Sequence, residues 1–493
     1  MAQTQNPSST FFLVFSLLIL ISFSPLSTSL RHQPLHFQNL KKFDVFDVSS
    51  SLKNTLQIFS PKNEKSPTST APYNSSVLSF SLHPRASIIK PHHKDYSTLT
   101  LSRLSRDSAR VDSVNSNLNF ALSSYTHSDL KPVQTAIHPE DLESPLTSGT
   151  SQGSGEYFAR IGVGQPVKEY YMVIDTGSDL SWIQCQPCTD CYQQTDPLFD
   201  PSSSSSYRTV SCSSQECSDL QISGCSGDKC LYQVSYGDGS YTVGDLATET
   251  VSFGNSGSVT SVPLGCGHDN EGLFQGAAGL IGLARTRLSL PGRIKATSFS
   301  YCMVNRDSSA SSTLEFNSAP PGDSVFASMV TNPKHDLFYY VELIGMSVGG
   351  EKLTIPESIF QVDENGRGGI IVDSGTAVTR LKTQAYNSLR DAFVKHASNL
   401  RSTSGMSLFD TCYDFSSMSS VKVPTVSFLF ANGQTLSLKP SNYLVPINSR
   451  GTYCLAFAPT DGALSIIGNV QQQGTRVSFD LAKRQLGFSQ NKC

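Results

Sequence analysis

The chain has 493 residues, which is more than one compact core usually holds, so we expect at least two domains. The net charge of −3 gives no electrostatic reason to bind nucleic acid. No apolar run reaches the roughly 18 residues of a membrane-spanning helix. Composition therefore excludes a basic nucleic-acid-binding protein, a membrane helix bundle and a disordered tail.

Charge and cysteine are unevenly distributed along the chain. Residues 30–146 carry 13 Lys and Arg against 10 Asp and Glu, a balance of +3, and residues 147–493 carry the remaining 24 against 30, a balance of −6. All twelve cysteines lie between Cys185 and Cys493. A basic leader without cysteine, followed by an acidic body rich in cysteine, is the pattern of a precursor.

The first residues of the chain support this interpretation. Phe11–Phe23 is an apolar run of signal-peptide length, followed by small residues, although Met1–Thr10 contains no Lys or Arg. The alternative is a short buried segment. We predict a signal peptide at 1–29, a propeptide at 30–150 and secretion to the extracellular space or apoplast, with endomembrane or vacuolar diversion as the alternative. An even number of exported cysteines predicts disulfides.

The leader changes character along its length. Residues 30–95 are rich in Pro, Ser and His, so we expect little regular structure from them alone. They contain a glycosylation sequon at Asn74. The stretch Thr147–Gly155 is typical of a linker and is the expected cleavage region.

Between these parts lies a candidate amphipathic helix. Five apolar residues share one helical face, and three arginines recur along the same stretch: Leu101, Leu104, Val111, Val114 and Leu118, with Arg103, Arg106 and Arg110. One interpretation is a solvated surface helix. The other is a pro-segment that lays its cations across an acidic cleft and covers the residues within it.

The body from Glu156 onward consists of short β-branched and aromatic runs, such as Tyr157–Val163 and Tyr170–Ile174, separated by Gly, Pro, Asn or Asp. This pattern predicts a mainly all-β fold with few short helices. The clearest helical pattern is Thr383–Leu400.

The body also repeats itself. Val173–Ser178 (VIDTGS) is echoed by Ile371–Thr376 (IVDSGT). Each copy is followed by two aliphatic residues and a glycine, at Leu280–Gly282 and Ile466–Gly468, which lie 107 and 95 residues after the respective aspartates. The repeat predicts two similar lobes.

Each copy presents one aspartate in a tight Gly-containing turn beside hydroxyl groups that can donate to it. Two facing lobes would bring Asp175 and Asp373 together. Because two close carboxylates do not both ionise easily, they share a proton. The ionised carboxylate can take a proton from water, and the protonated one can polarise a carbonyl group. This pair predicts amide hydrolysis without a metal or a covalent intermediate.

The paired motifs resemble those of the pepsin-like aspartic proteases over residues 156–493. Tyr236–Ser240 is similar to the flap that closes over substrate, and Trp182, seven residues after Asp175, stands where the family has its flap-supporting tryptophan. The cysteine-rich insert, at about 185–230, resembles the nepenthesin-type plant branch. The long leader, Gly153–Phe158 and Phe409–Asp414 resemble the aspartic protease in guard cell group.

The resemblance implies a bilobal fold, with an N-terminal lobe at 151–340 and a C-terminal lobe at 341–493. It implies a secreted acid endopeptidase that acts on polypeptides, needs no cofactor or metal, and is monomeric, without nucleic acid or membrane anchor. The leader is the expected inhibitor. The site residues it implies are catalytic Asp175 and Asp373, substrate-binding Gly177, Ser178, Tyr236, Gly237, Asp238, Gly375 and Thr376, and flap-supporting Trp182.

The resemblance also implies six disulfides, whose connectivity the cysteine count alone leaves open. The implied pairs are Cys185–Cys188, Cys191–Cys266, Cys212–Cys230, Cys217–Cys225, Cys302–Cys493 and Cys412–Cys454. The alternative for the cluster at 185–191 is a zinc site, which an oxidising compartment disfavours. Asp410, in an Asp-Thr-Cys sequence without the glycine, is expected to be structural.

A different class of function is a catalytically silent binding or inhibitor protein on the same scaffold, as in relatives that resemble xylanase inhibitors and seed globulins. Both aspartates survive here in intact turns, which favours the active protease.

Overall fold

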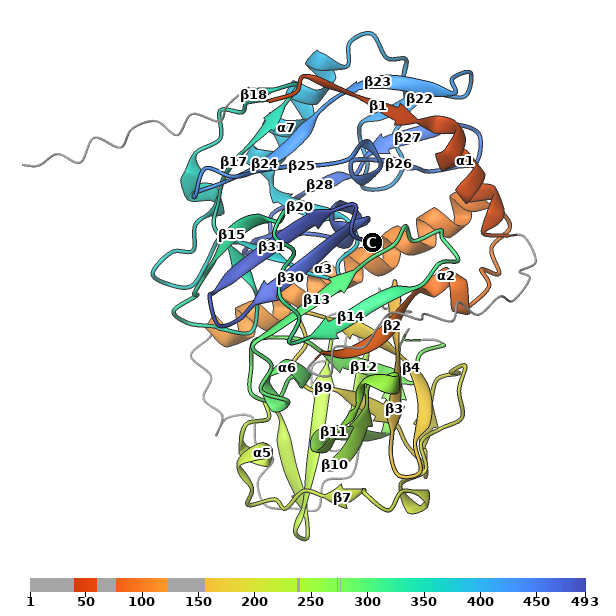
Figure 1. Cartoon of the computed structure of the whole chain (residues 1–493), viewed down its shortest axis with the longest axis vertical. Helices are drawn as coiled ribbons and strands as arrows, with labels where there is room; N and C mark the ends of the chain where they lie inside the picture. The colour runs from red at the N-terminus through yellow and green to blue at the C-terminus, as the bar shows by residue number, and fades with distance from the viewer. Residues whose placement is uncertain (1–39, 60–76, 123–155, 237–239, 273, 275) are drawn as a thin grey trace, which may run out of the picture. The chain divides into compact units, whose positions relative to one another are not determined.

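A computed structural model describes residues 40–59, 77–122, 156–236, 240–272, 274 and 276–493. They belong to one compact unit that runs from residue 37 to the C-terminus (Figure 1). The expected signal peptide, the sequon at Asn74 and the expected cleavage region Thr147–Gly155 lie outside the described residues. As expected, the body is mainly β, with few and mostly short helices. Within the described part of the chain, no helix is long and apolar enough to cross a membrane.

The first lobe is organised around two parallel strand pairs. Strand β4 (Lys168–Asp175) pairs with β12 (Gly279–Gly282), and β5 (Trp182–Gln184) pairs with β11 (Ser258–Glu271). Strands β12 and β5 are themselves antiparallel neighbours. Every residue of β5 and β12 is buried, as is typical of strands covered on both faces. The pairing ends with Gly282 opposite Asp175, so the aspartate emerges at the end of a rigid strand.

The second lobe repeats this scheme. Strand β19 (Ile370–Val372) runs parallel to β29 (Ser465–Ile467), and β20 (Thr379–Lys382) runs parallel to β28 (Phe457–Thr460). Strands β20 and β29 are antiparallel neighbours. The predicted internal repeat is confirmed, because both copies of the motif emerge from the same arrangement of strands.

A larger sheet joins the two lobes, with the order β3–β2–β14–β13–β30–β31–β15. Its strands are β3 (Tyr157–Val163), β2 (Leu78–Pro84), β14 (Ser312–Phe316), β13 (Ser298–Cys302), β30 (Thr475–Asp480), β31 (Gln485–Gln490) and β15 (Val325–Val330). Strand β2 belongs to the leader, and its Leu82 lies opposite both Ala159 and Ser312. A leader strand is therefore an interior strand of the sheet that connects the lobes.

The leader also binds the second lobe. Strand β1 (Phe43–Asp47) pairs with β23 (Ser420–Pro424), and helix α1 (Val48–Gln57) follows with Asp47 as its N-cap. Phe46 is buried, with its ring edge-on to Tyr453 at 5.1 Å. A short helix α2 (Arg85–Ile88) continues β2. Residues 30–95 are expected to form little regular structure alone. Strands β1 and β2 form within this range because strands of the body supply their hydrogen-bonding partners.

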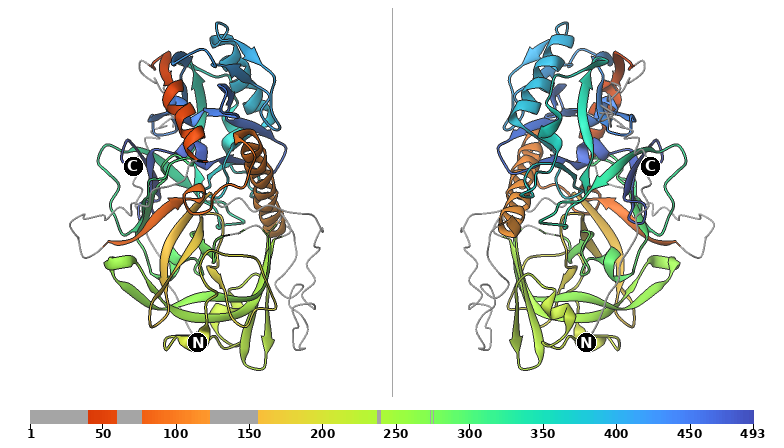
Figure 2. Two further views of the ribbon diagram at one scale, coloured as in Figure 1. Left: turned by 90° about the vertical axis from the view of Figure 1, so that its right-hand side faces the viewer. Right: turned by 90° about the vertical axis from the view of Figure 1, so that its left-hand side faces the viewer.

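The predicted amphipathic segment is helix α3 (Tyr96–Leu122). In both views of Figure 2, α3 runs as an orange coil alongside elements of the two lobes. Its apolar face packs against the second lobe, where Val111, Val114 and Leu118 contact a cluster around Phe338 and Tyr340. The prediction that Leu101 belongs to this apolar face is wrong. Leu101 is 44% exposed, because it lies away from the side that the helix turns toward the body.

The remaining elements cover these sheets. They are β6 (Asp190–Cys191), β7 (Arg208–Thr209), α5 (Gln215–Ser218), β8 (Ser223–Ser226), β9 (Lys229–Ser235), β10 (Tyr241–Ser252), α6 (Leu290–Arg293), β16 (Tyr340–Val341), β17 (Leu343–Val348), β18 (Glu351–Lys352), α7 (Thr383–His396), β21 (Ser402–Thr403), β22 (Cys412–Asp414), β24 (Val426–Phe430), β25 (Thr435–Ser437), β26 (Leu444–Pro446), β27 (Thr452–Leu455) and α8 (Asn469–Gln472). Helix α7 is the one predicted at Thr383–Leu400. It buries Ala385, Leu389 and Phe393 against the second lobe.

All twelve cysteines form disulfides, and two of the expected pairs are present: Cys302–Cys493 and Cys412–Cys454. The expected pairs Cys185–Cys188 and Cys191–Cys266 are wrong, and the structure has Cys185–Cys266 and Cys188–Cys191 instead. The cause is strand register. Cys185 follows β5, whose Ile183 lies opposite Cys266 in β11, so the Cα atoms of Cys185 and Cys266 are only 5.4 Å apart.

The other two expected pairs, Cys212–Cys230 and Cys217–Cys225, are also exchanged. The structure joins Cys212 to Cys225 and Cys217 to Cys230. Cys225 and Cys230 face each other across the β8–β9 hairpin, so either could accept either partner. Helix α5 turns Cys217 into the core where Cys230 is buried, which leaves Cys225 for Cys212.

Candidate active site

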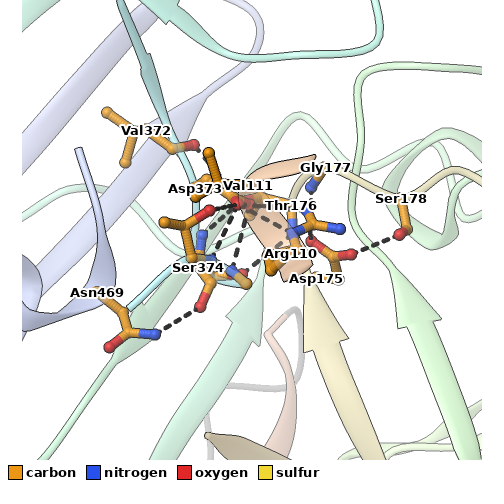
Figure 3. Close-up of polar contacts among 12 residues, drawn as sticks. Arg110, Val111, Asp175, Thr176, Gly177, Ser178, Val372, Asp373, Ser374 and Asn469 are labelled. Carbon is orange, nitrogen blue, oxygen red and sulfur yellow. Dashed lines mark hydrogen bonds and ion pairs between the residues drawn. The ribbon is translucent and has the colours of Figure 1, made fainter. Parts of the chain in front are cut away.

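The two repeated turns meet at the boundary between the lobes (Figure 3). Asp175 ends β4 and is 3% exposed, and Asp373 directly follows β19 and is 1% exposed. The lobes exchange hydrogen bonds beside the pair: the Ser374 N–H donates to Thr176 Oγ1 at 2.9 Å, and the Thr176 N–H donates to Ser374 Oγ at 3.1 Å. The reciprocal bonds hold the two turns in a fixed relation.

Each carboxylate is bound by its own turn in the same way. Asp175 accepts the Gly177 N–H at 2.9 Å and the Ser178 hydroxyl at 2.5 Å. Asp373 accepts the Gly375 N–H at 3.2 Å and the Thr376 hydroxyl at 2.6 Å. Four of the residues expected to bind substrate therefore contact the two carboxylates directly: Gly177, Ser178, Gly375 and Thr376.

The two glycines also let the lobes approach each other. A Cβ atom on Gly375 would lie 2.8 Å from Asp175 Oδ1, and one on Gly177 would lie 3.3 Å from Asp373 Oδ1. Any side chain at either position would press on the carboxylate of the opposite lobe. The Asp-Ser/Thr-Gly sequence is thus needed for the pairing of the carboxylates as well as for each turn.

Arg110 of helix α3 lies against both aspartates. Its Nη2 is 2.6 Å from Asp175 Oδ1 and 3.3 Å from both carboxylate oxygens of Asp373, and its Nε is 3.3 Å from Asp373 Oδ2 (Figure 3). Arg110 is itself buried. One guanidinium therefore occupies the position where a reacting group would meet the pair.

The environment moves the pKa values of the two carboxyls apart. Burial raises the pKa of Asp175; Arg110 opposes the rise and the charge of Asp373 adds to it. Burial acts in the same direction on Asp373, but Arg110 and the hydrogen bonds from Thr376 and Gly375 outweigh it, so the pKa of Asp373 is lowered. A pair with one raised and one lowered pKa holds a single shared proton over a range of pH.

Further ion pairs anchor α3 to the body. Arg106 Nη2 lies 2.9 Å from Glu156 Oε1, and Arg103 Nη1 lies 2.8 Å from Asp307 Oδ1. Burial would raise the pKa of Glu156, but Arg103, Arg106 and Arg306 lower it to about 2. Of the three leader arginines expected to cover the aspartates, Arg103 and Arg106 do not reach them and bind other carboxylates instead. The interpretation of α3 as a solvated surface helix is wrong, because these cations are buried.

Trp182 and Tyr236, to which the resemblance gives the roles of flap support and flap tyrosine, are hydrogen-bonded to each other. Trp182 Nε1 donates to the Tyr236 hydroxyl at 2.8 Å, and the Phe274 ring lies edge-on to Trp182 at 5.1 Å. Gly237 and Asp238 lie outside the described residues. The Tyr236 hydroxyl is therefore held by a buried indole.

A cavity of about 540 Å³ opens beside the pair. Its lining includes Gly177, Ser178 and Tyr236 on the first lobe, residues 331–337 opposite them, and Asn117 of α3. The cavity is a part of the cleft that the helix leaves unfilled, and three residues expected to bind substrate face it.

The sequence reasoning missed an oppositely charged contact of the leader. Asp107 lies among the leader arginines, and its Oδ2 is 2.8 Å from Arg380 Nη2 of strand β20. The sequence did contain a signal for this contact, because Asp107 is an acidic residue on a helix whose neighbouring charged residues are arginines. Arg380 itself stands in no recognisable motif.

The two lobes have the same arrangement of strands, and each contributes one buried aspartate from an Asp-Thr/Ser-Gly turn to the pair. These features define the class of bilobal aspartic proteases. The chain matches the family described as xylanase inhibitor N-terminal over residues 157–317 and the one described as xylanase inhibitor C-terminal over residues 338–490. The chain belongs to the plant pepsin-like aspartic protease family.

Two curated relatives come from Arabidopsis thaliana. Aspartyl protease family protein 2 is 50% identical over 80% of this chain and 81% of its own length. Protein aspartic protease in guard cell 2 is 42% identical over 93% of this chain and 96% of its own length, in agreement with the resemblance to that group. A crystal structure of edgp superimposes with a TM-score of 0.59 and 21% identity over 69% of this chain and 93% of that chain, which shows the shared fold.

Proposed function

We propose that the chain is the precursor of a secreted aspartic endopeptidase that hydrolyses peptide bonds in proteins at acid pH. One observation carries the proposal: Asp175 and Asp373 are both retained, buried and bound by mirrored hydrogen bonds at a junction of two lobes. Buried paired carboxylates are unfavourable for a fold and are expected where catalysis uses them.

The mechanism follows from the shared proton. A water between the carboxylates loses a proton to the ionised member and attacks the substrate carbonyl carbon, while the protonated member donates a hydrogen bond to the carbonyl oxygen. The tetrahedral intermediate collapses when a proton passes to the leaving nitrogen. The Gly177 and Gly375 N–H groups and the Ser178 and Thr376 hydroxyls fix the carboxylate oxygens throughout.

The leader is the inhibitor of its own enzyme in this proposal. Arg110 fills the position of the attacking water, and the apolar face of α3 lies along the second lobe. Charge attraction between the basic leader and the acidic body holds this state at neutral pH. Acidification protonates the pair and weakens the contact with Arg110, so removal of the leader follows.

A catalytically silent binding protein is the second candidate, and the matching families take their descriptions from xylanase inhibitors. Such a protein would keep the cleft but would not need both aspartates in working turns. The two candidates differ in one measurable property, which is turnover of a peptide bond.

The test uses the full-length precursor, processed by acidification and assayed on an acid-denatured protein. We expect pepstatin-sensitive cleavage that is greatest in acid and declines as both carboxylates ionise. Asp175→Asn and Asp373→Asn should each lower the rate by about 10²–10⁴-fold or more, because an amide keeps the shape but cannot share the proton.

Asp410→Asn is the matched control, because Asp410 bonds Tyr386 and Thr411 outside the catalytic turns. It should leave cleavage unchanged. Full activity of either catalytic variant would contradict the dyad, and a processed protein that cleaves nothing would favour the binding function.

Secretion is tested separately by expressing the tagged precursor in plant cells with its own leader. The apolar segment at Phe11–Phe23 and the six disulfides support entry into the secretory pathway. We expect the shortened protein in the apoplastic fluid. Accumulation in vacuoles would contradict the extracellular address.

A further inference from the structure

The leader covers a buried cation that the proposed reaction does not use. Arg380 lies on β20 and its side chain is 5% exposed. Its Nη1 donates to the Val378 carbonyl oxygen at 2.8 Å, and its Nη2 lies 2.8 Å from Asp107 Oδ2 of the leader. Among the described residues, Asp107 is the only carboxylate within ion-pair distance of this guanidinium.

The Asp107 carboxylate is also bound by the backbone of the second lobe. It accepts the Ala377 N–H at 2.5 Å and the Val378 N–H at 3.3 Å. Asp107 has no exposed surface. Two successive N–H groups and a guanidinium are the donor set that a carboxylate prefers, because charge-assisted bonds are the stronger ones and adjacent N–H groups form an anion-binding concavity.

This donor set lies next to the catalytic turn. Ala377 follows Thr376, whose hydroxyl binds Asp373. Removal of the leader takes away Asp107 and leaves the N–H groups and Arg380 facing the emptied cleft. A guanidinium beside two adjacent N–H groups, with its carboxylate partner removed, is a preformed binding site for a new anion.

We propose that Arg380, with the N–H groups of Ala377 and Val378, is a substrate subsite for a carboxylate, supplied by an Asp or Glu side chain near the scissile bond. We name it the Arg380 subsite. The inference rests on the proposed protease function and specifies its substrate class: polypeptides with an acidic residue at one fixed position relative to the cleaved bond. In the precursor, Asp107 occupies the subsite as a substrate side chain would.

The test scans one neutral peptide, acetylated and amidated so that no terminal carboxylate is present. Gln is placed at each of three positions on either side of the scissile bond and compared with Glu there, at about pH 5, where Glu is largely ionised. The processed protein should cleave the peptide with Glu at one position at least about tenfold faster in kcat/KM, as expected for a charge-assisted bond.

In Arg380→Gln, the ratio of kcat/KM for the Glu peptide to kcat/KM for the Gln peptide should fall to about one, whatever the absolute rates of the variant. Arg390→Gln is the matched control, since Arg390 pairs with Asp391 and Asp410 at the surface of α7. A separate arm compares the amidated neutral peptide with its free-acid form. A preference that follows the free terminus alone would overturn the assignment to side chains.

The outcomes separate the two proposals. If the neutral peptide is cleaved but no position favours Glu, or if the preference survives in Arg380→Gln, the subsite is refuted and the protease function stands. If no peptide is cleaved, the protease function fails and the subsite fails with it. A scan of the unsubstituted protein in which no position favours Glu refutes the subsite even if the variant does not fold.

Discussion

Replacing Arg110 by Met in the full-length precursor removes the cation between the aspartates and keeps most of the apolar side chain. The Arg110 Nη2 lies 2.6 Å from Asp175 and 3.3 Å from Asp373, and all three groups are buried. Removing one member of a buried ion pair costs about 3–5 kcal/mol, because the partner is left uncompensated. Two carboxylates would remain under α3, so we expect release of the helix to become roughly 10²–10⁴-fold more favourable at neutral pH.

The pH dependence follows from the two pKa shifts. The pKa of Asp373 is lowered, which means that the closed precursor favours the ionised carboxylate. This contribution to stability is fully present at pH values above the ordinary pKa of an aspartate, and it is lost as the pH falls through the lowered pKa. The raised pKa of Asp175 makes it the first of the pair to take up a proton. The effect of Arg110→Met should therefore be largest near neutrality and should shrink toward acid.

The assay has one readout that needs no catalysis. Hydrogen exchange of the α3 amides at pH 7 should speed up about 10²-fold or more in Arg110→Met. At pH 5 the variant should cleave peptide without the lag that the unsubstituted precursor shows during conversion. Arg293→Met is the control, because its ion pair with Glu216, at 2.7 Å, lies on the first lobe away from α3. An α3 that stays protected and a lag that stays unchanged would refute the inhibitory role of Arg110.

Two further predictions concern the anchors of the fold. The pKa of Glu156 is about 2 instead of its ordinary 4.5, because Arg103, Arg106 and Arg306 together outweigh its burial. Its ionised form therefore stabilises the folded precursor by about 3 kcal/mol above pH 4.5, and this is lost as the pH falls toward 2. In a catalytically dead precursor, Glu156→Gln should lower Tm at pH 6 and flatten its decline below pH 4.5; an unchanged Tm profile would contradict the anchor. Non-reducing peptide mapping should link Cys185 to Cys266 and Cys188 to Cys191, and a Cys185–Cys188 peptide would show that the register argument fails.

The features that the sequence predicted best are those repeated within it. The two copies of the Asp-Thr/Ser-Gly motif, with their distant aliphatic–Gly partners, predicted the parallel pairs β4–β12 and β19–β29 and the meeting of Asp175 with Asp373. Arg110 was one of three candidates because helical spacing places all three arginines on neighbouring turns. Which of them reaches the pair depends on the position of α3 along the cleft, and no local pattern encodes that position.

The features that could not be predicted depend on contacts between distant segments. The exchange of disulfide partners follows from the strand register of Cys266 beside β5 and from the turn of α5, neither of which appears in cysteine spacing. The leader strands β1 and β2 lack strong periodicity and form where β23, β3 and β14 offer free edges. The bond from Asp107 to Arg380 joins residues that only the docked helix brings together.

The place of β2 inside the connecting sheet has a consequence for how the molecule is made. Residues 78–84 pair on one side with β3 and on the other with β14, so in this structure the sheet is continuous only through the leader strand. Once the leader is removed, the backbone groups of both flanking strands lose a partner at that position. A processed molecule that later unfolds no longer carries the strand on which its sheet was assembled. If the leader is removed as proposed, the persistence of the processed protein is set by the height of its unfolding barrier and not by an equilibrium with the unfolded chain.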